Sequence, residues 1–461
     1  MSNIERTQRA ERGGRLVPPV LGRDAGSTLS RRAALVRLGT ALPIVLGGLP
    51  GFWRSASAAP AGLPLTPADD RFLEDLERTT FRFFWECADP RTGLVKDRSR
   101  ATEPDAREIA SIAATGFGLT ALCIADQRRW LEPGQARERA RATLRFLRET
   151  LPHEHGFYFH FVNWRTGERA WKCELSSIDT ALLLCGVLTC RQHFADADIR
   201  RSAGEIYDRV DWRWMMQGGP FLLHGWKPES GFLKARWDTY CEHSMLYLLA
   251  LGANQHPIPA EAWHAWKRPP FEYAGFRYIN PRAPLFIHQF SHAWFDFRDR
   301  RDCHTDYFEN SVKATKAHRQ FCLSLRDKFP HFSNDVWGIT ASDSAKGYVA
   351  WGGPPAQGPL DGTLVPCAAG GSLPFLPGEC LRCLRTLQDR YGERAWKHFG
   401  FVDAFNPATG WFAPDVIGID AGITLLMAEN ARTGFVWRTF MKNEEAQRAM
   451  AKAGFSEAVP K

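Results

Sequence analysis

Four segments of this sequence are apolar around almost the whole circumference of a helix, and they constrain the fold more than any other feature. They cover residues 109–125, 178–188, 245–251 and 423–428. A helix that is apolar on every side has to be buried on every side. The chain must therefore surround these segments with other elements.

A second type of helical segment supplies that covering. It has one apolar stripe among many charged residues, and it occurs at residues 135–151, 198–210, 310–327 and 379–391. The two types roughly alternate along the chain, as expected when each inner helix is followed by an outer one. Strand patterns are sparse. The pattern predicts an all-α fold, an α/α barrel with about a dozen helices of ordinary length.

The sequence shows no internal repeat, low-complexity tract or Pro/Ser linker, so we expect residues 59–461 to form one domain. Residues 352–377 are rich in Gly and Pro and are predicted to be a loop. A loop of that length favours a functional role over a simple connection.

The first 58 residues have the composition of an export leader. The run SRRAAL at residues 30–35 fits a twin-arginine signal, an apolar stretch follows at 41–49, and Ala56-Ser57-Ala58 fits a cleavage site. The apolar stretch is too short to span a bilayer. We expect the twin-arginine machinery to export a product without membrane insertion, starting near Ala59, to the periplasm or beyond.

The positive net charge of the chain does not by itself indicate a nucleic-acid-binding surface, because most of it lies in the leader. The formal net charge is +8, but residues 1–58 hold nine Arg against three acids and contribute +6 of it. The remainder is too weakly basic for a phosphate-binding surface, and no nucleic-acid-binding motif is present. A nucleic-acid partner is not expected.

The chain has 11 cysteines, an odd number with irregular spacing. A domain of this size does not depend on disulfides, and Cys380-x-x-Cys383 has no second ligand pair. We interpret these two cysteines as buried helix residues and expect no metal and no cofactor.

Three of the apolar helices begin with an acid: Asp179, Glu242 and Asp420. Glu174 and Asp415 lie just ahead of the first and the third. The spacings Ser176-x-x-Asp179 and Thr239-x-x-Glu242 also fit a capping box, so a purely structural role is an alternative. Carboxyl groups at the mouth of a barrel would suit glycosidic bond cleavage, which needs one protonated and one ionised carboxyl group.

Aromatic residues gather in the loops beside these acids, and stacking on aromatic rings is how proteins hold the apolar face of a sugar. The set comprises Trp164, Trp171, Trp226, Trp237, Tyr240, Trp337, Trp351 and Trp411. The alternative is that these rings belong to a Trp-rich core. His288, His292 and His304 do not follow a known zinc spacing, and we expect structural or substrate-positioning roles for them.

Several blocks of sequence resemble a known family. They are NDVWGITASD at 334–343, DGT at 361–363 with GGSLPF at 370–375, WF at 411–412 with IDAG at 419–422, ENARTG at 429–434, FWE at 84–86 and GFG at 116–118. Together they resemble the glycoamylase-like family of glycoside hydrolases, which includes bacterial endo-β-1,2-glucanases. The resemblance extends over roughly residues 70–455.

This resemblance implies an (α/α)6 toroid that hydrolyses β-1,2-linked glucans or their oligosaccharides with inversion and without a metal. Glu242 and Asp179 are the implied catalytic acids, with Glu174 as a further candidate. The implied sugar-binding residues are Trp337, Asp343, Tyr348, Asp361, Asp415 and Asp420. To these we add Trp171, Trp226, Tyr240, His292 and Trp411 from the loops.

One departure from the family keeps alternatives open. Ser176 and Ser177 stand where endo-acting members carry at least one carboxylate. An exo-acting enzyme or a noncatalytic glucan-binding protein would fit this change. A polysaccharide lyase on a similar toroid is a third hypothesis, for which Tyr240, His243 and His292 would supply the base.

Overall fold

The computed structural model describes residues 65–354 and 358–457. The leader predicted at residues 1–58, with its export signal and cleavage site, therefore lies outside the described residues. In the part of the chain that is described, no helix is long and apolar enough to cross a bilayer.

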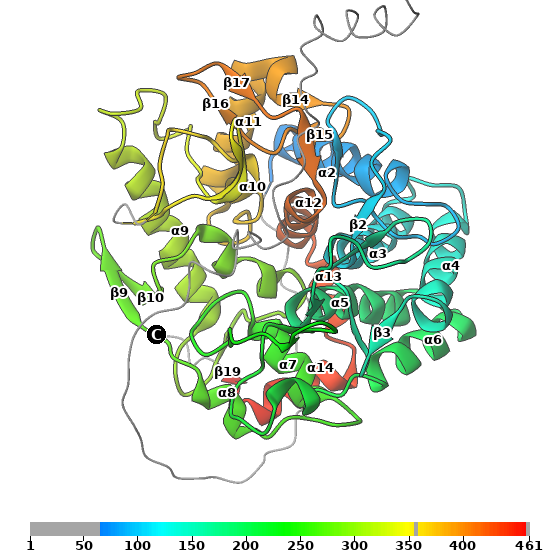
Figure 1. Cartoon of the computed structure of the whole chain (residues 1–461). Coiled ribbons are helices and arrows are strands. Elements are labelled where there is room, and N and C mark those ends of the chain that lie inside the picture. The colour runs from blue at the N-terminus through cyan, green and yellow to red at the C-terminus, as the bar shows by residue number, and fades with distance from the viewer. Residues whose placement is uncertain (1–64, 355–357, 458–461) are drawn as a thin grey trace, which may run out of the picture.

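The described chain is mainly helical (Figure 1). The helices are α2 (Pro67–Glu86), α3 (Ile112–Arg128), α4 (Gln135–Glu149), α5 (Ser177–His193), α6 (Ala197–Asp208), α7 (Ser244–Gly252), α8 (Glu261–Ala265), α9 (Tyr307–Ser324), α10 (Pro366–Gly370), α11 (Pro377–Ala395), α12 (Gly418–Arg432), α13 (Phe435–Phe440) and α14 (Glu444–Lys452), with 3₁₀ turns η3 (Trp214–Met216), η4 (Leu285–His288) and η5 (Phe290–Ala293).

Short antiparallel strands, mostly in pairs, lie in the connections between the helices. The pairs are β1 (Arg98–Arg100) with β18 (Asp415–Ile417), β2 (Ile109–Ser111) with β5 (Phe161–Asn163), β3 (His153–Glu154) with β4 (Phe157–Tyr158), β9 (Pro270–Tyr273) with β10 (Phe276–Ile279), β11 (Arg300–Arg301) with β19 (Ser456–Glu457), β12 (Ala341–Ser344) with β13 (Gly347–Ala350), β14 (Trp396–Lys397) with β15 (Gly400–Phe401) and β16 (Phe405–Asn406) with β17 (Trp411–Phe412). One sheet has three strands, β6 (Leu175–Ser176), β7 (Gly225–Lys227) and β8 (Gly231–Phe232).

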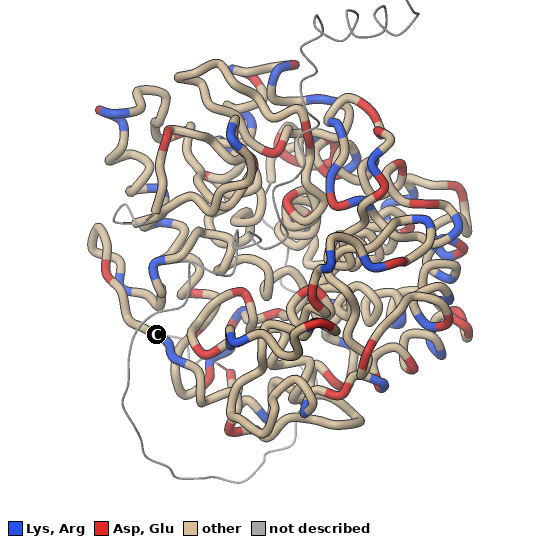
Figure 2. The backbone as a smooth tube through the Cα atoms, in the orientation of Figure 1, with Lys and Arg blue, Asp and Glu red and all other residues tan. Residues whose placement is uncertain are grey.

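The two predicted types of helix are present. All nine residues of α7 are buried, and α3 and α5 are buried continuously over residues 112–125 and 177–190. The amphipathic segments became α4, α6, α9 and α11, which bury only a stripe. Figure 2 shows Lys and Arg mixed with Asp and Glu along the outer helices α4 and α6.

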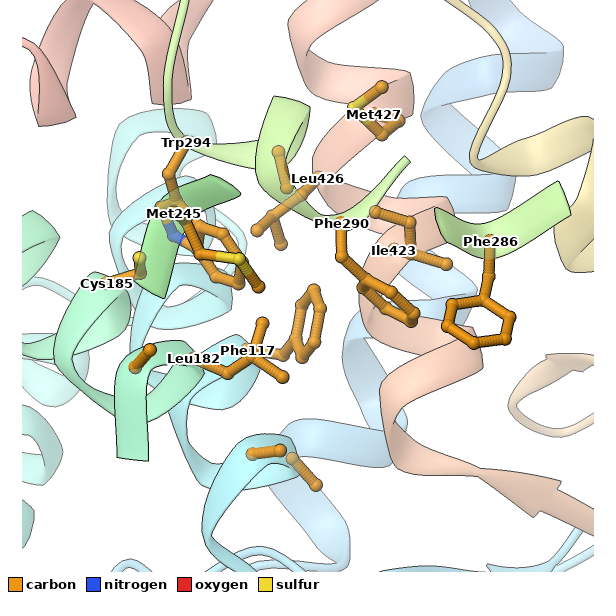
Figure 3. Close-up of a cluster of buried hydrophobic side chains, with 14 of the residues drawn as sticks. Phe117, Leu182, Cys185, Met245, Phe286, Phe290, Trp294, Ile423, Leu426 and Met427 are labelled. Carbon is orange, nitrogen blue, oxygen red and sulfur yellow. The ribbon is translucent and has the colours of Figure 1, made fainter. Parts of the chain in front are cut away.

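The buried helices meet at a common centre. Helix α3 packs against α5 and α12, α5 packs against α7, and α10 packs against α12. Figure 3 shows their side chains converging, with Phe117 of α3 and Phe290 of η5 turned toward Leu182, Met245 and Ile423. The rings of Phe117 and Phe290 are 5.9 Å apart. This centre is packed with apolar side chains, which fixes the inner helices relative to one another.

The α3–α5 crossing is especially close. A Cβ atom on Gly186 would lie 2.1 Å from the carbonyl oxygen of Gly116, and one on Gly116 would lie 2.3 Å from that of Leu182. Only glycine allows the two backbones to approach this far.

Two predictions about elements are wrong. Residues 352–377 are not wholly loop, because Pro366–Gly370 form α10, a helix too short for a periodic pattern. Residues 109–111 are not the first turn of α3, since they form strand β2 paired with β5.

Candidate active site at the starts of the buried helices

The starts of α12, α3 and α5 are held side by side by a series of backbone hydrogen bonds. Gly418 donates to Asp97 O (2.8 Å), and Asp97 in turn donates to Ile109 O (2.9 Å). Ile112 donates to His160 O (3.3 Å), and His160 donates to Glu174 O (2.9 Å). Three helices far apart in sequence therefore present their first turns at one place.

A first group of carboxyl groups, the His160 cluster, consists of His160, Glu174 and Asp179. His160 lies between the two acids, with Nδ1 3.2 Å from Glu174 Oε1 and Nε2 3.6 Å from Asp179 Oδ2. Glu174 and Asp179 are 7% and 6% exposed. His160 thus lies in contact with both carboxyl groups and helps to position them.

Asp179 also takes part in the capping of its helix, in which Ser176 is the N-cap residue. The hydroxyl of Ser176 donates to Asp179 Oδ2 and accepts from the Asp179 backbone N–H (3.3 Å). Ser177 is bound as well, since its hydroxyl donates to Leu223 O (2.7 Å) and accepts from Trp237 Nε1 (2.9 Å). These two serines serve the local structure.

Glu242 is not a helix cap, contrary to the alternative reading of its spacing from Thr239. Helix α7 begins at Ser244, after Glu242, and the Thr239 hydroxyl donates to Asp238 instead. The backbone carbonyl of Glu242 accepts from the Ser291 hydroxyl (2.6 Å), and the Cys241 thiol donates to its carboxylate. The side chain of Glu242 is 4% exposed. Its burial beside polar partners is the arrangement expected of a functional carboxyl group.

His243, the residue after Glu242, packs against core residues that also contact the start of α5. Its ring packs 5.5 Å from Trp237 and 4.7 Å from Trp266, and burial lowers the pKa of His243 far below its usual value. Trp237 in turn bonds Ser177 at the start of α5. His243 is thus an uncharged packing residue, and it connects the segment that carries Glu242 with the helix that carries Asp179.

A second group, the α12 cluster, consists of four aspartates, two of which are paired with arginines. The Asp343 carboxylate accepts two bonds from Arg98 (both 2.8 Å), and the Asp415 carboxylate accepts two from Arg107 (2.6 and 2.8 Å). Asp403 Oδ2 accepts the Asp343 backbone N–H at 2.7 Å. The fourth member, Asp420, lies in the first turn of α12.

Asp403 is the member of this cluster that sequence reasoning missed. Its carboxyl group is buried, and burial together with the neighbouring Asp420 and Asp343 carboxyl groups raises the pKa of Asp403 well above its usual value. A cavity of about 20 Å³, lined by Asp403 and Asp420, lies beside the pair. That volume is enough for one water molecule. No motif surrounds Asp403 in the sequence.

Aromatic rings flank the His160 cluster. Trp171 is 54% exposed, its ring is 5.0 Å from that of Phe161, and the Phe161 ring stacks on His160 at 3.8 Å. Trp226, half-buried on β7, pairs with Leu175 of β6. An exposed indole beside buried carboxyl groups is typical of a sugar-binding surface.

Three aromatic residues predicted to bind substrate lie in the core instead. Trp337 has no exposed surface. His292 is enclosed by Phe297, Phe375 and the Ser311 hydroxyl, and burial lowers its pKa to about 3. Tyr240 is 2% exposed and bonds His288 at 3.0 Å. We therefore correct these assignments: the residue types suit a groove and a core equally well, and here they pack the core.

The remaining predicted sugar-binding residues lie at or near the surface. Tyr348 is half-buried on β13, directly opposite Asp343 of β12. Trp411 is half-buried on β17. Asp361 is exposed, and its carboxylate accepts the Thr363 N–H (2.9 Å) to stabilise a turn. Tyr348 therefore borders the α12 cluster, whereas Asp361 shares no described contact with it.

The chain resembles known proteins over most of its length. The Glycoamylase family model, described as "Putative glucoamylase", matches residues 234–444. An exo-β-1,2-glucooligosaccharide sophorohydrolase (non-reducing end) from Parabacteroides distasonis is 27% identical over 428 residues, which cover 84% of this chain. The chain spans 58% of the length of that curated relative.

Two solved structures are similar in fold and sequence. A protein from Bacteroides uniformis that carries the same description as the family model is 29% identical with a TM-score of 0.79, covering 85% of this chain and 99% of its own. An endo-β-1,2-glucanase from Chitinophaga pinensis, solved with sophorotriose and glucose, is 25% identical with a TM-score of 0.77, covering 84% of this chain and 99% of its own.

Proposed function

We propose that this chain is a member of the glycoamylase-like family of glycoside hydrolases and that it hydrolyses β-1,2-glucan or its oligosaccharides. The observation that carries this proposal is the meeting of buried carboxyl groups at the starts of the inner helices, beside an exposed indole. In support, a relative and a solved structure whose names state action on this linkage each cover 84% of this chain.

The proposed chemistry is an inverting displacement by two carboxyl groups. One protonated acid gives its proton to the leaving oxygen, while an ionised carboxylate activates the attacking water. Glu242 is the first candidate and Asp179 the second. Glu174, Asp415 and Asp420 are candidates for the partner role.

The fold proposed for this chemistry is an (α/α)6 toroid. In support, six inner positions can be followed along the chain: α3, α5, α7, η4 with η5, α10 and α12. Outer helices pack against five of them: α4 on α3, α6 on α5, α14 on α7, α11 on α10 and α2 on α12. Helix α9 packs against η4, at the remaining position. The short η4–η5 and α10 elements replace full inner helices.

The residues that would support the lyase alternative are buried. It requires an accessible base, yet Tyr240 and His292 lie in the core and His243 has no exposed surface. Burial also raises the pKa of Tyr240, which disfavours the ionised form that a base would need.

We further propose that the twin-arginine machinery exports residues 59–461 as one catalytic domain to the periplasm or beyond. The support for this is the leader sequence, with its arginine pair at 31–32 and small residues at 56–58.

A substrate panel combined with Glu242→Gln tests the activity. The purified chain is offered β-1,2-glucan, other β-glucans and disaccharides, and product size and anomeric form are measured by NMR. We expect new reducing ends from β-1,2-glucan with inverted configuration. Release of a single short oligosaccharide would indicate exo action, and a mixture of sizes would indicate endo action.

We expect Glu242→Gln to lower kcat at least about 100-fold while the melting temperature stays nearly unchanged, because glutamine has the same size but gives no proton. Glu229→Gln is the matched control, since Glu229 is exposed and pairs only with Arg169 in the described structure. Binding of glucan without new reducing ends in the wild type would indicate the noncatalytic alternative.

A further inference from the structure

Three side chains with metal-binding atoms meet at the surface, away from the carboxyl clusters. They are His264 at the end of α8 and Cys303 and His304 in the loop before α9. His264 Nδ1 lies 3.0 Å from His304 Nε2 and 3.8 Å from Cys303 Sγ. All three donor atoms lie within 4.8 Å of one another.

The Asp302 carboxylate fixes the loop that carries Cys303 and His304 through hydrogen bonds. One carboxylate oxygen of Asp302 accepts the backbone N–H groups of His304 and Thr305 (both 2.8 Å). The other accepts from Trp263 Nε1 (2.8 Å), next to His264 in α8, and from the Tyr307 hydroxyl (3.0 Å). Asp302 thus fixes both segments of the site to one buried carboxylate.

From this geometry we propose that His264, Cys303 and His304 bind a zinc ion. Around a tetrahedral zinc ion, two nitrogen ligands stand about 3.3 Å apart, and a nitrogen and a sulfur about 3.6 Å apart. The distances from His264 differ from these values by only a few tenths of an ångström. Imidazole and thiolate are the ligands that zinc prefers, and hard cations such as Mg²⁺ are disfavoured by them.

The site has an open fourth position because its three residues are exposed. Three protein ligands with a solvent-facing fourth position are the arrangement in which zinc keeps a water molecule or an exchangeable ligand. Three charged groups act on the site, Arg268, Asp302 and Glu261, and the first two lie 4.0 Å apart.

Binding requires a defined movement of protons. One of the two imidazoles now donates its ring proton to the other across the 3.0 Å contact. On binding, that proton moves by exchange with solvent to the other nitrogen of its ring, and the Cys303 thiol releases its proton to water. Zinc then takes the place of the shared proton and joins α8 to the start of α9.

Cys303 provides a direct readout, because it is the only exposed cysteine of the 11 and all of them lie in the described residues. The tag-free chain is titrated with Zn²⁺ alone in a calorimeter, and a thiol-reactive dye then measures the rate at which Cys303 is modified. We expect one Zn²⁺ per chain and at least about 10-fold slower modification of Cys303 with zinc bound.

The variants Cys303→Ser, His264→Ala and His304→Ala should each weaken zinc binding at least about 100-fold, which is the upper end of the effect of losing a supporting residue. His256→Ala is the matched control, since its side chain is 53% exposed and lies outside the site. We expect its affinity to equal that of the wild type.

Cobalt replacement provides a second measurement that does not depend on modification of the thiol. Co²⁺ should give a thiolate-to-cobalt absorption band in the wild type and in His256→Ala, but none in Cys303→Ser. Zinc binding that survives in the His264→Ala/His304→Ala double variant would overturn the proposal. So would a modification rate of Cys303 that is unchanged by zinc.

Discussion

Asp403 is a buried acid whose proton should make stability depend on pH. Its folded pKa lies well above the ordinary value of 3.8, because it is buried next to Asp420 and Asp343. An acid with a raised folded pKa binds more protons folded than unfolded between the two values. The free energy of unfolding therefore falls as the pH rises through that interval.

Asp403→Asn removes this dependence and keeps an oxygen to accept the Asp343 backbone N–H. As the pH rises above about 4, we expect the wild type to lose stability relative to the variant, by about 1.4 kcal/mol for each unit of pKa shift. Melting temperatures of both proteins between about pH 4 and pH 8 measure the difference. Asp361→Asn, at an exposed position, is the control. Parallel curves for the wild type and Asp403→Asn would contradict the prediction.

Sequence reasoning identified carboxyl groups better than it identified aromatic contacts. Asp179 and Glu174 come together because both flank the start of one buried helix, which the apolar run at 178–188 marks. Trp337 was misplaced, because an indole in a loop block looks the same whether it packs inward or outward. Only the three-dimensional arrangement separates the two cases.

The crossing of α3 and α5 sets the position of two inner helices, and it should tolerate no added methyl group. Gly116→Ala and Gly186→Ala would each place a Cβ within 2.3 Å of a backbone oxygen on the other helix. Because backbone atoms cannot rotate away, we expect each variant to lose about 1–3 kcal/mol of stability. Thermal unfolding followed by circular dichroism measures the loss.

Gly204→Ala is the matched control for this crossing. Gly204 lies inside α6, and a Cβ there would meet nothing within 4 Å. Alanine in a helix interior is better than glycine by about 0.5–1 kcal/mol, so the control should melt slightly higher than the wild type. A loss in the control equal to that at Gly116 would contradict the prediction, because the added methyl group would then lower stability without any close backbone contact.

Helices and strands could be predicted where their hydrophobic pattern extends over several turns. The segment at 135–151 became α4 at Gln135–Glu149, because a 15-residue amphipathic stripe has several turns to define its period. Helix α10, with five residues between Gly-rich segments, has little more than one turn. The paired strands have at most four residues each, so their alternation is too short to detect.

At the scale of the whole molecule, the fold protects its thiols by burial. Of the 11 cysteines, ten are buried and only Cys303 is exposed. The closest pair, Cys123 and Cys190, has its sulfur atoms 3.7 Å apart, which is longer than the roughly 2 Å of a disulfide bond. Burial also raises the pKa of thiols such as Cys380 and Cys383, which suppresses the reactive thiolate.

This arrangement has a consequence for the proposed export route. A chain that crosses the membrane unfolded would expose all 11 thiols to an oxidising compartment, and non-native disulfides would form. A chain that crosses already folded would expose one. We therefore expect protein isolated from outside the cytoplasm to react with one equivalent of a thiol dye when native and with 11 equivalents when denatured. Fewer than ten in the denatured protein would mean that buried cysteines had oxidised on the way, which contradicts export in the folded state, whereas ten would mean only that the exposed Cys303 had oxidised.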